Sequence, residues 1–177
     1  GAVGGRPADP VRHARLINLA EGLTVGAGIH PPELLVLEDA ALNLAVYGRR
    51  PQHPVVVVTA GLLAELSRVE LEGILATALV DIRRGTTGPA TASASIRGIG
   101  AARIVPADRD SDDDLAAVAL TRYPPGLASA LDKMDAKGTA LRQPPGATGL
   151  LWLADPGGPS PVRRASLQTR VEALSEL

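Results

Sequence analysis

The chain contains no cysteine and no phenylalanine among its 177 residues. The absence of cysteine excludes disulfides, thiolate metal ligands and a cysteine nucleophile. Only one tryptophan and two tyrosines are present, so the hydrophobic core must be built from Leu, Val, Ile and Ala. Nucleic-acid binding through bases stacked on aromatic side chains is correspondingly disfavoured.

The chain also lacks a strong net charge and a long apolar run. Its formal net charge is −1, which implies no bulk electrostatic attraction to nucleic acid or to an anionic membrane. No uninterrupted apolar run approaches the ~20 residues needed to cross a bilayer. The first residues show neither an initiator Met nor a signal-peptide pattern, so we expect part of a longer chain. The length predicts a single domain over residues 1–177.

The most informative stretch is Ser67–Arg84, which has the pattern of an amphipathic helix. Ser67 followed three residues later by Glu70 is a capping-box signature, in which two side chains satisfy backbone N–H groups at a helix start. The apolar positions then recur at spacings of three and four: Leu71, Ile74, Leu75, Ala78, Leu79 and Ile82. Two arginines and Gly85 favour an end to the helix there.

Strands are predicted mainly before this helix and further helices mainly after it. An N-cap at Asp9 begins the first helix, and the predicted strands are 33–38, 43–48 and 54–59. Later helices are predicted at 112–123, 127–137 and 166–177. Residues 85–102 are rich in Gly, Ala, Ser and Thr and are expected to form a flexible loop. This distribution predicts one α+β domain.

The central helix, written L-E-G-I-L-A-T-A-L-V-D-I-R, resembles the active-site helix of the HtpX-like zinc metallopeptidases, relatives of the CAAX prenyl endopeptidases. Asn43–Gly48 is similar to that family's N-A-F-A-x-G strand, and Arg109–Asp114 to its R-E-x-x-A-D motif. Gly149–Pro156 resembles a strand-like segment that precedes the family's last helix. The resemblance implies a zincin-like α+β fold with a small mixed sheet, the former active-site helix beneath it, and additional helices.

In that family the helix carries H-E-x-x-H, whose histidines bind zinc and whose glutamate activates the zinc-bound water. This chain has Thr77 and Asp81 at the histidine positions and Ala78 at the position of the general base. Asp110 matches the third zinc ligand, which is a glutamate in the family. The resemblance therefore implies a degenerate member with an empty zinc site and no cofactor, in which Thr77, Asp81 and Asp110 are vestigial ligand positions.

These replacements predict a catalytically inactive pseudopeptidase, not an enzyme, that acts as a protein- or peptide-binding or scaffold module. The alternative is a metal-dependent hydrolase in which Asp81 and Asp110 hold a hard cation such as Mg²⁺ or Ca²⁺. A third interpretation is a domain that only stabilises a larger chain.

Zincins generally hold their substrate as a strand added to the edge of the sheet, which needs no metal. The residues of the matching edge are Asn43, Leu44, Ala45, Val46, Tyr47 and Gly48. Alternatively, residues 85–102 or a neighbouring subunit cover this edge. The expected partner is a protein or peptide and not nucleic acid.

HtpX-like proteins usually carry membrane helices outside the catalytic core. The resemblance therefore implies a location at the cytoplasmic face of the cell membrane or in the cytoplasm, with any membrane association through segments outside this chain.

Overall fold

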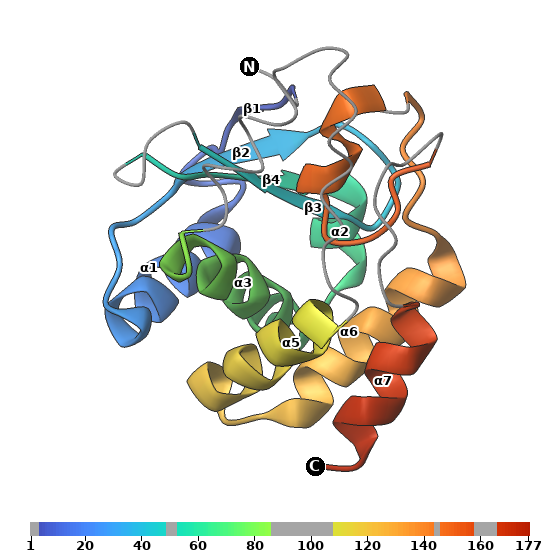
Figure 1. The fold of residues 1–177 in the computed structure, drawn as a ribbon. Helices are drawn as coiled ribbons and strands as arrows, with labels where there is room; N and C mark the ends of the chain where they lie inside the picture. Colours follow the sequence, from blue (N-terminus) through green and yellow to red (C-terminus); the bar gives the residue numbers. More distant parts are fainter. Residues whose placement is uncertain (1–3, 49–52, 86–107, 144–145, 158–165) are drawn as a thin grey trace.

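A layer of helices packs against one face of a four-stranded sheet (Figure 1). This computed structural model describes residues 4–48, 53–85, 108–143, 146–157 and 166–177. In chain order the elements are β1 (Arg6–Pro7), α1 (Ala14–Ala27), β2 (Glu33–Leu37), β3 (Leu44–Tyr47), β4 (Val55–Thr59), α2 (Ala60–Glu65), α3 (Arg68–Arg83), α5 (Asp108–Thr121), α6 (Pro124–Lys137), the 3₁₀ helix η1 (Gly146–Leu151) and α7 (Leu167–Ser175).

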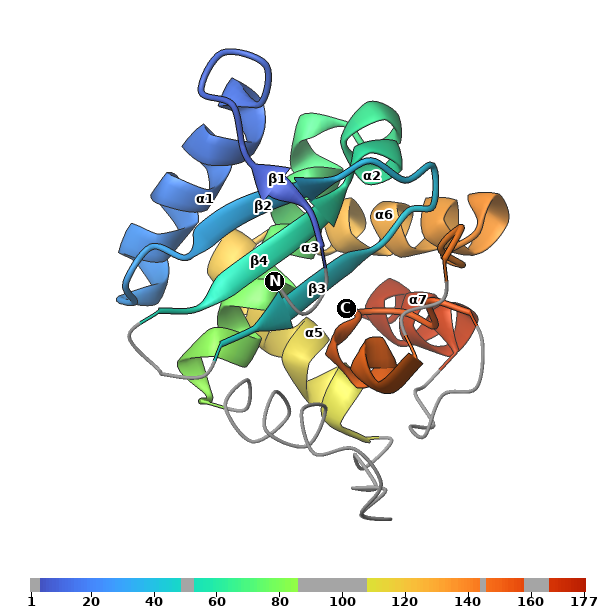
Figure 2. The ribbon, with the colours of Figure 1, turned by 90° about the horizontal axis from the view of Figure 1, so that it is seen from above.

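The sheet is mixed, with the strand order β1-β2-β4-β3. β2 and β4 run parallel, whereas β1 and β3 pair antiparallel with their neighbours. Figure 2 shows β3 at one end of this order, with η1 beside it. The α+β class with a small mixed sheet is therefore confirmed.

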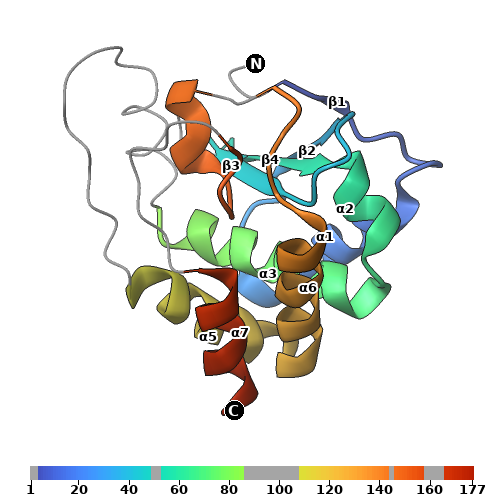
Figure 3. The ribbon, with the colours of Figure 1, turned by 90° about the vertical axis from the view of Figure 1, so that its right-hand side faces the viewer.

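β4 is the central strand of the core, as its run of β-branched residues predicts. Val56 and Val58 pack with the helices, and Val57 belongs to a second apolar cluster on the opposite face of the sheet. Figure 3 shows the helices on one side of the sheet and η1 on the other. The buried members of this second cluster are Leu35, Ala41, Ala45, Val57, Leu141, Leu151 and Trp152.

α3 lies under the sheet and contacts α1, α5 and α6. Its approach to α6 is close at Gly73, where a Cβ atom would lie 2.9 Å from the Cα of Leu127. Glycine at this position therefore sets the distance between the two helices.

Four predicted elements have different boundaries or forms in the structure. Asp9 accepts hydrogen bonds from the N–H groups of the next turn, and α1 begins only at Ala14. α5 begins at Asp108 and α6 at Pro124, both earlier than predicted. The strand-like segment 149–156 is instead the end of η1, followed by an isolated bridge at Trp152.

Two predictions about the organisation of the chain are not tested by the structure. The predicted loop 85–102 lies outside the described residues from position 86 onward. The single domain over 1–177 stays a prediction. No helix in the described parts of the chain is both long and apolar enough to cross a membrane.

Candidate functional site

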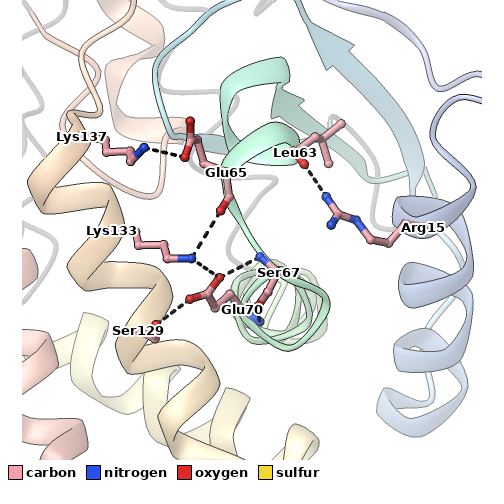
Figure 4. Close-up of polar contacts among 8 residues, drawn as sticks. All are labelled: Arg15, Leu63, Glu65, Ser67, Glu70, Ser129, Lys133 and Lys137. Carbon is pink, nitrogen blue, oxygen red and sulfur yellow. Dashed lines mark hydrogen bonds and ion pairs between the residues drawn. The ribbon is translucent and has the colours of Figure 1, made fainter.

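The start of α3 is fixed by a polar network around the carboxylate of Glu70 (Figure 4). The capping box is present: the Ser67 N–H donates to this carboxylate at 2.7 Å, and the Ser67 hydroxyl accepts from the Glu70 N–H. Ser129 and Lys133 on α6 also donate to it, at 2.5 and 2.8 Å. Burial works against the charged carboxylate, but the donors from Lys133, Ser129 and Ser67 lower the pKa of Glu70 to about 2. α3 is thereby held against α6 at a defined position.

The middle of α3 is apolar and buried where the zinc-binding motif is expected. Thr77 is buried, and its hydroxyl donates at 2.7 Å to the carbonyl of Ile74 in its own helix. Ala78 is also buried and offers only a methyl group. Neither side chain supplies a lone pair suited to zinc or a group that accepts a proton from water.

The two carboxylates of the predicted site lie on neighbouring helices, since α3 contacts α5. Asp81 is partly exposed in the last turn of α3, whereas Asp110 is 6% exposed near the start of α5. Both have polar or charged partners in the structure. Within the described residues, no three His, Cys, Asp or Glu side chains converge to hold a metal ion. The residues present therefore do not fit a zinc site of the H-E-x-x-H type.

Asp110 lies near a buried ion pair between α5 and α7. Arg170 donates to both carboxylate oxygens of Asp114, at 2.6 and 2.7 Å. Burial raises the pKa of Asp114, and the charge of Asp110 raises it further, while the Arg170 guanidinium lowers it. Burial lowers the pKa of Arg170, but the hydrogen bond and charge of Asp114 outweigh this and raise it. The pair ties the last helix to the helix that carries Asp110.

The predicted peptide-binding edge, Asn43–Gly48, corresponds to β3 and its flanking residues. The Thr59 N–H donates to the Asn43 carbonyl at 3.1 Å. Because inward and outward backbone groups alternate along an antiparallel strand, Ala45 and Tyr47 also direct theirs toward β4. The outward backbone groups of β3 are therefore those of Leu44, Val46 and Gly48.

Part of this outer edge is occupied by the chain itself. The Leu153 N–H donates to the Leu44 carbonyl at 2.8 Å, and Trp152 pairs antiparallel with Ala45 as an isolated bridge. Gly48 also has a partner in the structure. Residues 152–153 thus take a position that a bound peptide strand would take and cover this part of the edge.

The side chain of Asn43 holds the end of this covering segment. Its amide NH₂ donates to the carbonyls of Thr139 and Ala154, both at 3.0 Å. Its amide oxygen accepts from the N–H groups of Leu44 and Ala154, at 2.9 and 3.2 Å. The side chain of Asn43 makes all four of these hydrogen bonds and is 0% exposed. It therefore has a structural role and is not available to a peptide.

Sequence comparison relates this chain to proteins named "Protease HtpX homolog" in several bacteria. The protein from Dictyoglomus turgidum is 30% identical over 195 aligned positions, which cover 84% of this chain and 63% of the relative. That from Acidiphilium cryptum is 36% identical over 95 positions, which cover 54% and 33%. That from Tropheryma whipplei is 28% identical over 184 positions, which cover 80% and 63%.

The chain belongs to the HtpX-like family. The HtpX-like chain spans about three fifths of the length of the curated relatives that it matches most fully. No family model matches it. No solved structure matches it either. The prediction that the HtpX-like chain is not an enzyme is wrong, because the relatives that establish its family are named as proteases.

Sequence reasoning located the helix, the carboxylates and the edge strand of the HtpX-like chain, but missed their partners. Lys133 and Ser129 carry no local signal that they bind Glu70, which lies far away in the sequence. The segment around Trp152 was recognised only as strand-like, and nothing in its pattern indicated pairing with β3. These contacts depend on how the chain folds back on itself.

Proposed function

We propose that this chain is the peptide-holding domain of an HtpX-like protease. In this proposal an extended segment of another protein adds to the outer side of β3 as an antiparallel strand, next to α3. The partner is therefore an unfolded or locally extended polypeptide, recognised mainly through its backbone.

One observation carries this proposal. The Leu153 N–H donates to the Leu44 carbonyl, and Trp152 pairs antiparallel with Ala45. The chain itself thus already pairs with the outer side of β3 at one antiparallel bridge, so the geometry of this edge suits strand addition. β3 also contacts α3, which places the strand beside the helix that carries Thr77 and Asp81.

The alternation of backbone groups along β3 specifies where a peptide would pair. Val46 is the central outward position, whereas the N–H of Ala45 faces β4. A proline at Ala45 would therefore disrupt the sheet itself. A proline at Val46 removes an outward donor instead, which an edge strand tolerates.

The proposal assigns no bond cleavage to Thr77, Ala78 or Asp81. We also propose that zinc does not bind at Thr77, Asp81 and Asp110. The support for this is chemical. The hydroxyl of Thr77 donates to the carbonyl of Ile74, and Ala78 has only a methyl group. The carboxylates of Asp81 and Asp110 already have partners in the structure. A location in the cytoplasm or at the cytoplasmic face of the membrane stays part of the proposal, supported by the family resemblance.

The test uses fluorescein-labelled oxidised insulin B chain, a short extended peptide without tryptophan, as the probe. Fluorescence anisotropy measures its binding to the wild type, to Val46→Pro and to the matched control Val46→Ala, which keeps the backbone N–H. We expect Val46→Pro to lose binding and Val46→Ala to retain it, with circular dichroism confirming the fold of both. Mass spectrometry of the probe records any hydrolysis separately.

Equal binding by the two variants would show that the outer edge of β3 does not hold the peptide. If Val46→Pro does not fold, hydrogen exchange in the wild type decides the question. The Val46 amide should then exchange more slowly when the probe is bound, and an unchanged rate contradicts the proposal.

A further inference from the structure

We infer that residues 146–153 form a displaceable cover over the peptide edge of β3, and that peptide binding requires this cover to move away. The inference rests on the proposed peptide-holding function and concerns how access to that same site is controlled. It names a segment of the chain itself as the competitor of the bound peptide.

The cover and a peptide strand compete for the same backbone groups. The Leu44 carbonyl faces outward and accepts the Leu153 N–H at 2.8 Å. Trp152 faces Ala45 in an antiparallel bridge, and the preceding helix η1 contacts β3. A peptide that pairs along the whole strand must therefore replace Leu153 at Leu44 and displace the residues before it.

The local structure of the cover is less stable than an α-helix or a ladder strand would be. η1 is a 3₁₀ helix of six residues, longer than the three or four that are common for this poorer hydrogen-bond geometry. It contains Gly146 and Gly149, which lose more backbone entropy on ordering than other residues do. Only one isolated bridge, and no ladder, joins the following residue to β3.

The side chain of Trp152 is a second, independent indication that the cover can open. This side chain is 0% exposed and packs in the cluster above the sheet, against Ala45 and Val57 among others. Among the described residues, no acceptor binds its indole N–H. A buried donor without a partner destabilises the state that buries it, and opening would let water satisfy this N–H.

The segment that moves ends before Ala154, because Ala154 is held in place by hydrogen bonds. Asn43 binds both the N–H and the carbonyl of Ala154, and the Thr139 hydroxyl donates to the carbonyl of Asp155 at 2.7 Å. The chain beyond the cover is thus anchored to the start of β3. Residues 146–153 can leave the edge while residues 154–156 stay in place.

Trp152 is the only tryptophan of the chain, so its fluorescence reports directly on the cover. Unlabelled oxidised insulin B chain is titrated into the wild type, into Leu153→Pro and into Leu153→Ala. We expect the wild-type emission maximum to move to longer wavelength as the peptide binds, because the indole gains contact with water.

The two variants test the hydrogen bond that closes the cover. Leu153→Pro removes the N–H that binds Leu44, whereas Leu153→Ala keeps it. We expect Leu153→Pro to show red-shifted emission without peptide and to bind the probe about fivefold more tightly than Leu153→Ala, the effect of losing one competing backbone hydrogen bond.

The outcomes separate this inference from the proposed function. Binding of the probe with unchanged Trp152 emission, and equal affinity of the two variants, overturns the cover but leaves peptide binding intact. No binding by any variant overturns the proposed function and the cover with it. If Leu153→Pro does not fold, wild-type hydrogen exchange decides: a faster Leu153 amide in the complex supports the cover, and an unchanged one overturns it.

Discussion

Arg170 and Asp114 form a two-point ion pair in which both side chains are almost completely buried, at 2% and 3% exposure. Each charge depends on the other because neither has access to water. The pair joins α7 to α5, so the last helix of the chain is held by a contact in the core and not only by surface packing.

We predict that Arg170→Met destabilises the protein by about 3–5 kcal/mol, since it leaves the carboxylate of Asp114 buried without its partner. The double variant Arg170→Met with Asp114→Leu should recover much of this loss. Arg84→Met is the control, because Arg84 binds Asp113 from a partly exposed position and should cost less than about 1 kcal/mol. Urea unfolding measures all three, and equal losses for the two single variants would contradict the prediction.

We predict that Glu70 makes the stability of the domain dependent on acidic pH. The pKa of Glu70 is lowered from 4.5 to about 2 in the folded state. Its contribution to the free energy of unfolding is therefore fully present above the ordinary pKa and is lost as pH falls toward 2. The contribution is at most about 3 kcal/mol at neutral pH. Urea unfolding of the wild type and Glu70→Gln should therefore give free energies that converge between about pH 5 and pH 2. A difference that does not change with pH would be inconsistent with this network.

We predict opposite effects for alanine at two helical glycines. At Gly73 a Cβ atom would lie 2.9 Å from backbone atoms of Leu127, so Gly73→Ala forces α3 and α6 apart and costs roughly 1–3 kcal/mol. At Gly22 on α1 nothing lies within 4 Å, so Gly22→Ala should stabilise by roughly 0.5–1 kcal/mol through helix propensity. Thermal unfolding of both variants tests the prediction, which fails if Gly73→Ala is neutral.

We predict that the wild type shows no zinc affinity in the micromolar range or tighter that depends on Asp81. Thr77→His combined with Asp81→His should introduce zinc binding, because histidines one turn apart can bind the metal from one face of a helix. Calorimetric titration with Zn²⁺ measures both, and Asp81→Ala is the control for any wild-type signal. Tight wild-type binding that Asp81→Ala abolishes would refute the prediction.

The sequence by itself determined the local elements around the candidate site. Ser67 and Glu70 predict the start of α3 because a capping box acts within one turn of helix. The valine run of β4 predicts a buried strand because β-branched side chains suit a pleated surface. The family resemblance added the order of the elements and the correspondence of Thr77 and Asp81 to the zinc ligands.

Tertiary structure alone decided which groups remain available for function. Glu70 is held by Ser129 and Lys133, and Leu44 by Leu153, through contacts between distant parts of the chain that no local pattern encodes. Which backbone groups of β3 face outward depends on its register with β4, since a shift of one residue would exchange them. The sequence thus specified an edge strand, whereas the folding of residues 146–154 onto it decided that part of this edge is covered.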